Sequence, residues 1–146
     1  MKKKFRSSCM IASALDLIGD KWSLLIVRDM LMHQKKIFKD FVSSDENVAT
    51  NLLSSRLKHL ESLNIISKRK LDTNKKENIY LLTEKGLDLA PLIVELAIWS
   101  DKYVREYNNG MNPFVIGETN KMTVVENAQN DYKEFARRFD DNIATN

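Results

Sequence analysis

The chain has 146 residues, of which 43% are hydrophobic, and this is enough to bury a single hydrophobic core. Its net charge of +3 is concentrated in residues 1–6 and 50–80, which suits a nucleic-acid partner better than an even distribution would. One cysteine excludes an internal disulfide and fits a reducing cytosol, and no apolar run is long enough to predict a signal peptide or a membrane span.

Residues 1–8 are predicted to form a flexible basic arm, followed by a first helix that Ser7 or Ser8 can cap. Gly19 is a stop signal for this helix, and Asp20 is a start signal for the next one. The second helix, Lys21–Met32, is strongly apolar and is expected to lie centrally. We expect it to bury Trp22, Leu25, Ile26 and Met30.

Cys9 stands at the start of the first helix, where amide N–H groups and the preceding lysines would both favour its thiolate and lower its pKa. A reactive, redox-sensing thiol is therefore one interpretation. The alternative is a small buried hydrophobic side chain, which is the commoner fate of a lone cysteine.

The stretch 47–64, preceded by a short helix over Phe38–Ser43, has the pattern of an amphipathic helix. Its apolar stripe consists of Leu52, Leu53, Leu57, Leu60 and Leu63. Its outer face carries short hydroxyls, amides and a cation, groups that suit close approach to base edges and phosphates. The predicted DNA-contacting residues there are Thr50, Asn51, Ser54, Ser55 and Lys58. Arg56 falls on the leucine side and is expected to be structural, and His59 falls at the margin of the outer face.

Two strand-like runs, Ile65–Leu71 and Glu77–Leu82, flank a polar tip over Asp72–Lys76. A helix followed by a basic hairpin is the arrangement of a winged helix-turn-helix, in which the hairpin can lie along a phosphate backbone or enter a minor groove. The predicted wing contacts are Lys68, Lys70, Asn74, Lys75 and Lys76. The alternative is an ordinary solvated hairpin.

A long helix is predicted over Glu84–Tyr107, with Thr83 as its cap and a kink at Pro91. It is apolar on more than one face, so we expect a second copy of the chain to cover it. Residues 108–146 are predicted to be a linker and a last helix, Lys121–Phe139, that packs back on the domain or across a dimer.

The sequence offers no set of residues that would form a catalytic, metal or cofactor site. His33 and His59 are far apart in sequence, no glycine-rich phosphate loop is present, and no nucleophile has a base at usable spacing. We therefore expect no enzymatic activity and no cofactor.

In combination, several motifs resemble the HxlR family of bacterial transcriptional regulators, which are winged helices related to the MarR family. The resemblance covers about residues 9–103 and rests on Cys9, ALDLIGDKW (14–22), LLIVRDML (24–31), the F-x-D-F stretch 38–41, LLSSRLKHLE (52–61), YLLTEKG (80–86) and Trp99. Residues 124–132 are similar to the extra C-terminal helix of some members.

The resemblance implies a homodimer joined through its N-terminal and C-terminal helices and bound to double-stranded DNA at a roughly palindromic operator. The dimer-interface candidates are Ile11, Leu15, Leu92, Leu96, Trp99 and Tyr103. Several members sense electrophiles, aldehydes or oxidants through a cysteine that matches Cys9. With one cysteine, that chemistry would be a disulfide between chains or capping by a small thiol.

This chain departs from the family pattern at three places. Met10 stands where proline usually follows the cysteine, and the stretch DTNKKEN replaces a proline-containing wing. Ala49 stands where serine usually caps the recognition helix, at a cost of about 1 kcal/mol unless Asn47 or Thr50 takes over.

The predicted fold is therefore mainly α with a small β-hairpin wing, a winged helix-turn-helix over 9–107 with extra N- and C-terminal dimerisation helices. The predicted function is a cytoplasmic, sequence-specific transcriptional regulator, with repression the commoner outcome among similar proteins and a small-molecule effector left open. The alternative is a winged helix that binds proteins or a small ligand without regulating DNA.

Overall fold

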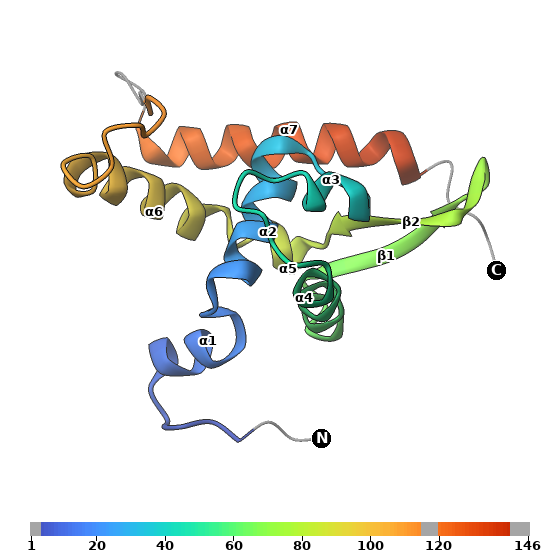
Figure 1. Ribbon diagram of the computed structural model, residues 1–146, viewed down its shortest axis with the longest axis horizontal. Coiled ribbons are helices and arrows are strands. Elements are labelled where there is room, and N and C mark those ends of the chain that lie inside the picture. The colour runs from blue at the N-terminus through green and yellow to red at the C-terminus, as the bar shows by residue number, and fades with distance from the viewer. Residues whose placement is uncertain (1–3, 115–119, 141–146) are drawn as a thin grey trace.

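The computed structural model describes residues 4–114 and 120–140. Its elements in chain order are α1 (Met10–Ile18), α2 (Lys21–His33), α3 (Phe38–Val42), α4 (Thr50–Ser62), β1 (Ile66–Leu71), β2 (Asn74–Leu82), α5 (Glu84–Leu87), α6 (Ala90–Tyr103) and α7 (Lys121–Asp140) (Figure 1). The predicted fold class is confirmed: the chain is mainly helical, and one antiparallel hairpin follows the helix-turn-helix of α3 and α4.

The hydrophobic core lies where α2, α4, α7 and the base of the hairpin meet. Its members include Val27, Met30, Phe41, Leu53, Leu57, Leu60, Ile66, Ile79, Leu81, Tyr132 and Phe135. The prediction that Trp22 and Leu25 are buried was wrong, because both are half-buried. Leu25 lines an open groove between α2 and α6 instead of facing the core.

The predicted long helix 84–107 is interrupted. Thr83 caps a short α5, with its Oγ1 accepting a hydrogen bond from the Gly86 amide at 3.2 Å, and α5 ends at Leu87. Helix α6 then begins at Ala90 with Pro91 in its first turn, where the missing N–H leaves no hydrogen bond unmade. Pro91 therefore starts a helix, and the predicted kink was wrong.

The hairpin is regular at its base and irregular at its tip. Strand pairing is unbroken from the pair of Ile66 with Leu82 to the pair of Lys70 with Asn78. The next pair is Leu71 with Asn74. Residues 75–77 therefore form a bulge beside the turn at 72–73, and β2 begins at Asn74 instead of the predicted Glu77.

Helix α7 packs back on the domain, which is one of the two placements expected for the last helix. It lies across α6 and α2 and extends towards the hairpin (Figure 1). Its Tyr132 and Phe135 are buried in the core, so α7 contributes to the same hydrophobic interior as the helix-turn-helix.

Candidate DNA-binding surface

Helix α4 presents a polar face to solvent because its opposite face is anchored in the core. Leu53, Leu57 and Leu60 are buried, whereas Leu52 and Leu63 are half-buried at the edges of the stripe. Of the predicted DNA-contacting residues, Ser54 is half-buried and the others are exposed, namely Thr50, Asn51, Ser55 and Lys58. The structure thus brings all five together on one helix, and the four other than Lys58 have short side chains that allow the backbone to approach a groove closely.

The start of α4 lacks a side-chain cap. Ala49 is the N-cap residue, and within this described segment no side chain hydrogen-bonds to the first amides of the helix, so neither Asn47 nor Thr50 takes over. Asn47 before the helix and Asn64 after it have left-handed φ values of 53° and 59°. Asparagine tolerates this conformation better than most residues, so both ends of α4 are set by sharp backbone turns.

A polar network holds the turn between α3 and α4 to α2. Asp29, with a side chain only 5% exposed, accepts a hydrogen bond from Ser44 Oγ at 2.5 Å. Lys35 Nζ lies 2.6 Å from the same Ser44 oxygen. Arg28 lies 2.6 Å from Asp29 and donates both terminal nitrogens to the Glu46 carboxylate at 2.6 and 3.0 Å. Sequence reasoning missed this network, although a lone aspartate inside an apolar helix was a signal for it.

The Arg28–Glu46 pair fixes the turn just ahead of α4. Its hydrogen bonds lower the pKa of Glu46 to about 2. Because the folded pKa lies below the ordinary value of 4.5, the pair stabilises the fold above that pH and loses its contribution as pH falls towards 2. The turn therefore keeps this ion pair throughout the neutral range.

The inner edge of α4 is tied to the corner between α1 and α2. His59 Nε2 lies 2.6 Å from the carbonyl oxygen of Leu17 in α1. The ring therefore faces α1, although His59 was predicted to lie at the margin of the DNA-facing side of the helix. Arg56 lies 3.6 Å from the Asp20 carboxylate, in agreement with the structural role expected for it. Asp20 also accepts from the Ser23 amide at 2.8 Å and caps α2.

Side chains along β1 point alternately to solvent and to the body of the domain. Lys68 and Lys70 are exposed on one face of β1, whereas Arg69 is half-buried on the other. Lys68 Nζ lies 3.9 Å from the Glu61 carboxylate of α4, a weak exposed contact that joins the wing to the recognition helix.

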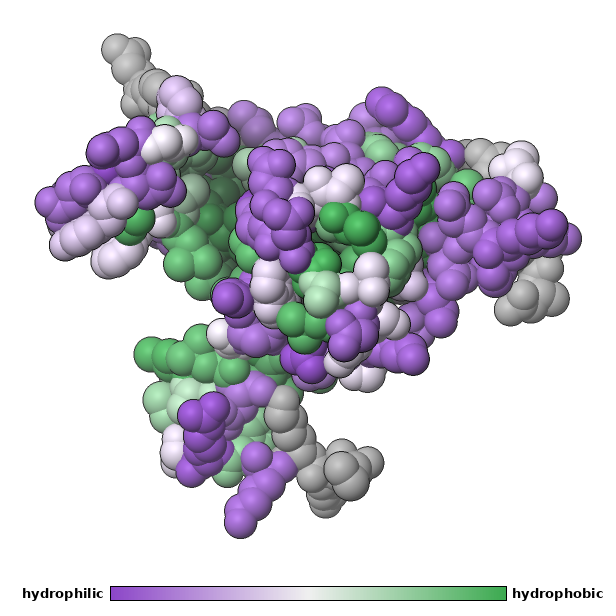
Figure 2. Space-filling model, in the orientation of Figure 1, coloured by the Kyte–Doolittle hydropathy of each residue, from purple (hydrophilic) through white to green (hydrophobic). Residues whose placement is uncertain are grey.

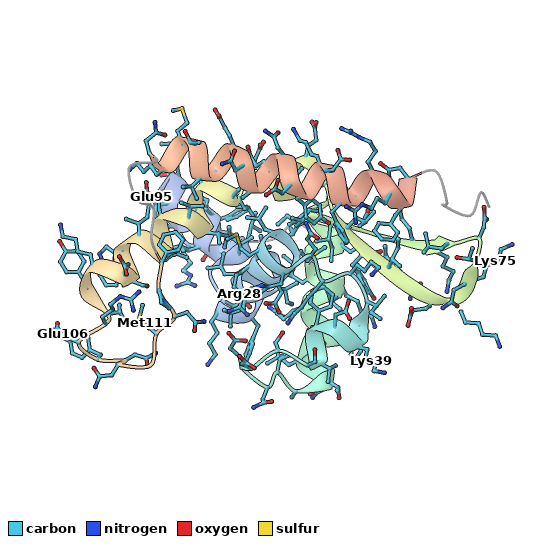
Figure 3. The ribbon with its side chains drawn as sticks, turned by 90° about the horizontal axis from the view of Figure 1, so that it is seen from above. Arg28, Lys39, Lys75, Glu95, Glu106 and Met111 are labelled. Atoms are coloured by element: carbon cyan, nitrogen blue, oxygen red, sulfur yellow. The ribbon has the colours of Figure 1, made fainter. Side chains whose placement is uncertain are left out.

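The far end of the hairpin gathers the remaining predicted wing residues. Asn74, Lys75 and Lys76 are all exposed, and the Asn74 side chain accepts a hydrogen bond from the Lys76 amide at 3.2 Å. Lys75 stands at the tip, well away from the body of the domain (Figure 3). A basic tip displaced in this way can reach a phosphate backbone beside the groove that α4 faces.

Helix α1 projects from the domain and buries none of its residues (Figure 1). Cys9, and not Ser7 or Ser8 as predicted, is its N-cap residue. The thiol is exposed, so of the two interpretations of Cys9 the one of a small buried side chain was wrong.

Large apolar side chains are exposed on α1 and α6. The exposed fractions of the predicted dimer-interface side chains are Ile11 73%, Leu15 57%, Leu92 40%, Leu96 45%, Trp99 58% and Tyr103 48%. Figure 2 shows apolar surface on α1 and in the hollow beside α6. Between α2 and α6 this hollow is a groove of about 630 Å³, with Leu24, Met32, Leu96 and Phe114 among its lining residues.

Among residues 4–114 and 120–140, no group of histidine, cysteine and acidic side chains could hold a metal ion. No helix in the same ranges is long and apolar enough to cross a membrane.

Comparison with known proteins identifies the family to which the chain belongs. The HxlR-like helix-turn-helix family matches residues 17–108. The transcriptional regulator YodB of Bacillus subtilis is 34% identical over 91 residues, which are 62% of this chain and 80% of YodB.

Solved structures agree with that match. PA1607 superposes with a TM-score of 0.66 at 31% identity, covering 80% of both chains. The reduced form of YodB has a TM-score of 0.56 at 32% identity and covers 68% of this chain and 98% of that chain. The redox regulator HypR in its oxidized form has a TM-score of 0.57 at 25% identity and covers 73% of this chain and 100% of that chain. The chain belongs to the HxlR family of helix-turn-helix transcriptional regulators, proteins that bind DNA and are not enzymes.

Proposed function

We propose that the protein is a cytoplasmic homodimer that represses transcription by occupying a roughly palindromic operator. The observation that supports this proposal most strongly is that the polar face of α4 and the basic hairpin tip are both exposed. Each carries groups that suit contact with DNA. Asn51, Ser54, Ser55 and Lys58 would read the major groove, and Thr50 would lie near phosphate at the helix start. The wing lysines would follow the flanking backbone.

Two substitutions separate base reading from phosphate contact. Asn51→Ala is expected to change the preference between operator variants by about 1–3 kcal/mol, because an amide can bond specifically to a base edge. Lys75→Ala is expected to weaken binding to all sequences alike and to reduce the dependence on salt. Fluorescence anisotropy titrations over a salt series measure both effects.

The paired variants also test the orientation of α4. If Asn51→Ala left sequence preference intact, α4 would face the groove in another way. If the wild-type chain retarded no genomic fragment even at low salt, the alternative would gain support, namely a winged helix that binds proteins or a small ligand.

The proposed dimer joins the exposed apolar side chains of α1 and α6 from two copies. A monomer in water would leave these large apolar side chains uncovered on both helices, and such exposure is typical of a protein–protein interface. Two copies would also present two recognition helices, as a palindromic site requires.

Cys9 is the proposed redox sensor of the regulator. It lies exposed at the start of α1, just outside the segment matched to the family, and HypR and YodB were solved in oxidized and in reduced or diamide-treated forms. Two Cys9 thiols, one from each chain, would form an S–S bond and pass two electrons and two protons to an oxidant such as diamide. Capping by a small thiol is the alternative product.

Diamide is therefore expected to lower operator affinity of the wild type at least tenfold and to leave Cys9→Ser unchanged. Non-reducing electrophoresis separates a disulfide between chains from capping by a small thiol. A Cys9→Ser variant that still left the operator on oxidation would remove the thiol mechanism and direct attention to a small effector in the α2–α6 groove.

A further inference from the structure

We infer that α7 is a brace for the wing, and that Tyr132 is a positioning residue which sets where the hairpin meets DNA. The inference rests on the proposed DNA contacts of the wing. It assigns a role in recognition to a helix that begins at Lys121, beyond the end of the family match at residue 108.

The first support is the hydrogen bonding of the edge of β2 that faces away from β1. Within residues 4–114 and 120–140 the sheet has two strands, so one edge of β2 faces other elements and its amides need partners. The Tyr80 amide donates to the Lys36 carbonyl at 2.7 Å, and the Leu82 amide donates to the Tyr132 hydroxyl at 2.8 Å. The Tyr132 hydroxyl thus takes the place of a third-strand carbonyl at the base of the wing.

The Tyr132 hydroxyl is well placed for this role because it is inaccessible to water. The side chain is fully buried, and this burial raises the pKa of Tyr132 to about 12. Its ring packs on Phe135 with a centroid separation of 5.7 Å, and Phe135 packs on Phe139 at 5.2 Å. The hydroxyl therefore stays neutral and its ring is held by neighbours one helical turn apart.

The same face of α7 meets the domain at three further points along its length. Gln129 Nε2 donates to the carbonyl of Leu87 at 3.0 Å, near the end of α5. Near the C-terminal end of α7, Lys36 lies over the Phe139 ring at 5.3 Å and Arg69 pairs with Asp140 at 2.8 Å. Side chains alternate along a strand, so Arg69 lies on the face of β1 towards α7, whereas Lys68 and Lys70 lie on the other face.

These contacts connect the brace to recognition without any contact between α7 and DNA. Figures 1 and 3 both show α7 running from α6 towards the hairpin, whose tip carries Lys75. A small rotation at the hairpin base moves a tip several residues away by a larger distance. Loss of the anchor at Leu82 would therefore spread the tip over many positions and reduce its phosphate contacts.

Tyr132→Phe tests the inference because it removes the hydroxyl and keeps the ring. Tyr107→Phe is the matched control, since Tyr107 is 82% exposed and lies outside both the DNA face and the core. Operator binding is measured over a salt series, and amide hydrogen exchange of the hairpin is followed in the free protein. Phe139→Ala is a second variant that weakens the same face of α7.

For Tyr132→Phe we expect about fivefold weaker binding, a log–log salt slope shallower by about one, and faster exchange at Leu82 and along the hairpin. Phe139→Ala should change the salt slope in the same direction, and Tyr107→Phe should change nothing. Unchanged slopes in Tyr132→Phe and Phe139→Ala, with a steep wild-type slope, would overturn the brace alone. A wild type that binds no DNA would overturn the proposed function as well.

Discussion

Asp29→Ala is expected to lower the free energy of unfolding by about 3 kcal/mol, because it removes the acceptor at the centre of a buried polar network. Without the carboxylate, Ser44 loses its acceptor, and Lys35 and Arg28 lose the negative charge that they share. The buried Ser44 hydroxyl would then lack the acceptor for its proton, which costs free energy because water cannot replace it. Urea denaturation followed by circular dichroism measures the change.

Asp29→Asn is the matched control for this prediction. It keeps the size of the side chain and one acceptor oxygen, so its cost should be clearly smaller than that of alanine. If alanine and asparagine cost the same, the charge would be the whole effect and the hydrogen bond from Ser44 would contribute nothing. A loss below about 1 kcal/mol in both would show that the network is not buried as described.

Leu96→Glu is expected to convert the protein into a monomer and to reduce operator affinity by a factor of 100 or more. Leu96 lies on α6 within the proposed interface, where a buried carboxylate would lack a partner. Two linked recognition helices bind a palindrome with an advantage of about 10² to 10⁴ over one. Light scattering should give a mass near 16.9 kDa in place of twice that value.

The control for Leu96→Glu introduces the same charge on a surface that has no proposed partner. Asn127 is exposed on α7, so Asn127→Glu should leave both the mass and the affinity as in the wild type. A wild type that is already monomeric, or a Leu96→Glu variant that remains dimeric, would contradict the proposed interface.

The elements that could be predicted from sequence are those with a strong local signal. The leucine spacing of α4 gave its buried face, and the two strand-like runs on either side of a polar tip gave the hairpin of β1 and β2. The break between α5 and α6 was missed because Pro91 can either kink a helix or begin one, and local sequence did not decide between the two.

The contacts that could not be predicted join residues distant in the chain. His59 is 42 residues from Leu17, and Tyr132 is 50 residues from Leu82. No periodicity of a single element carries information on such pairs. The same holds for the network around Asp29, whose members come from α2, the loop after it and the turn before α4.

The late position of α7 in the chain has a consequence for biosynthesis. When β1 and β2 have left the ribosome, Tyr132 has not yet been made, so the edge of β2 at Leu82 has an unpaired amide. An open strand edge beside apolar residues such as Leu81 is a template for pairing with another chain. The nascent protein therefore exposes this strand edge to other chains until α7 has been made and has packed against β2.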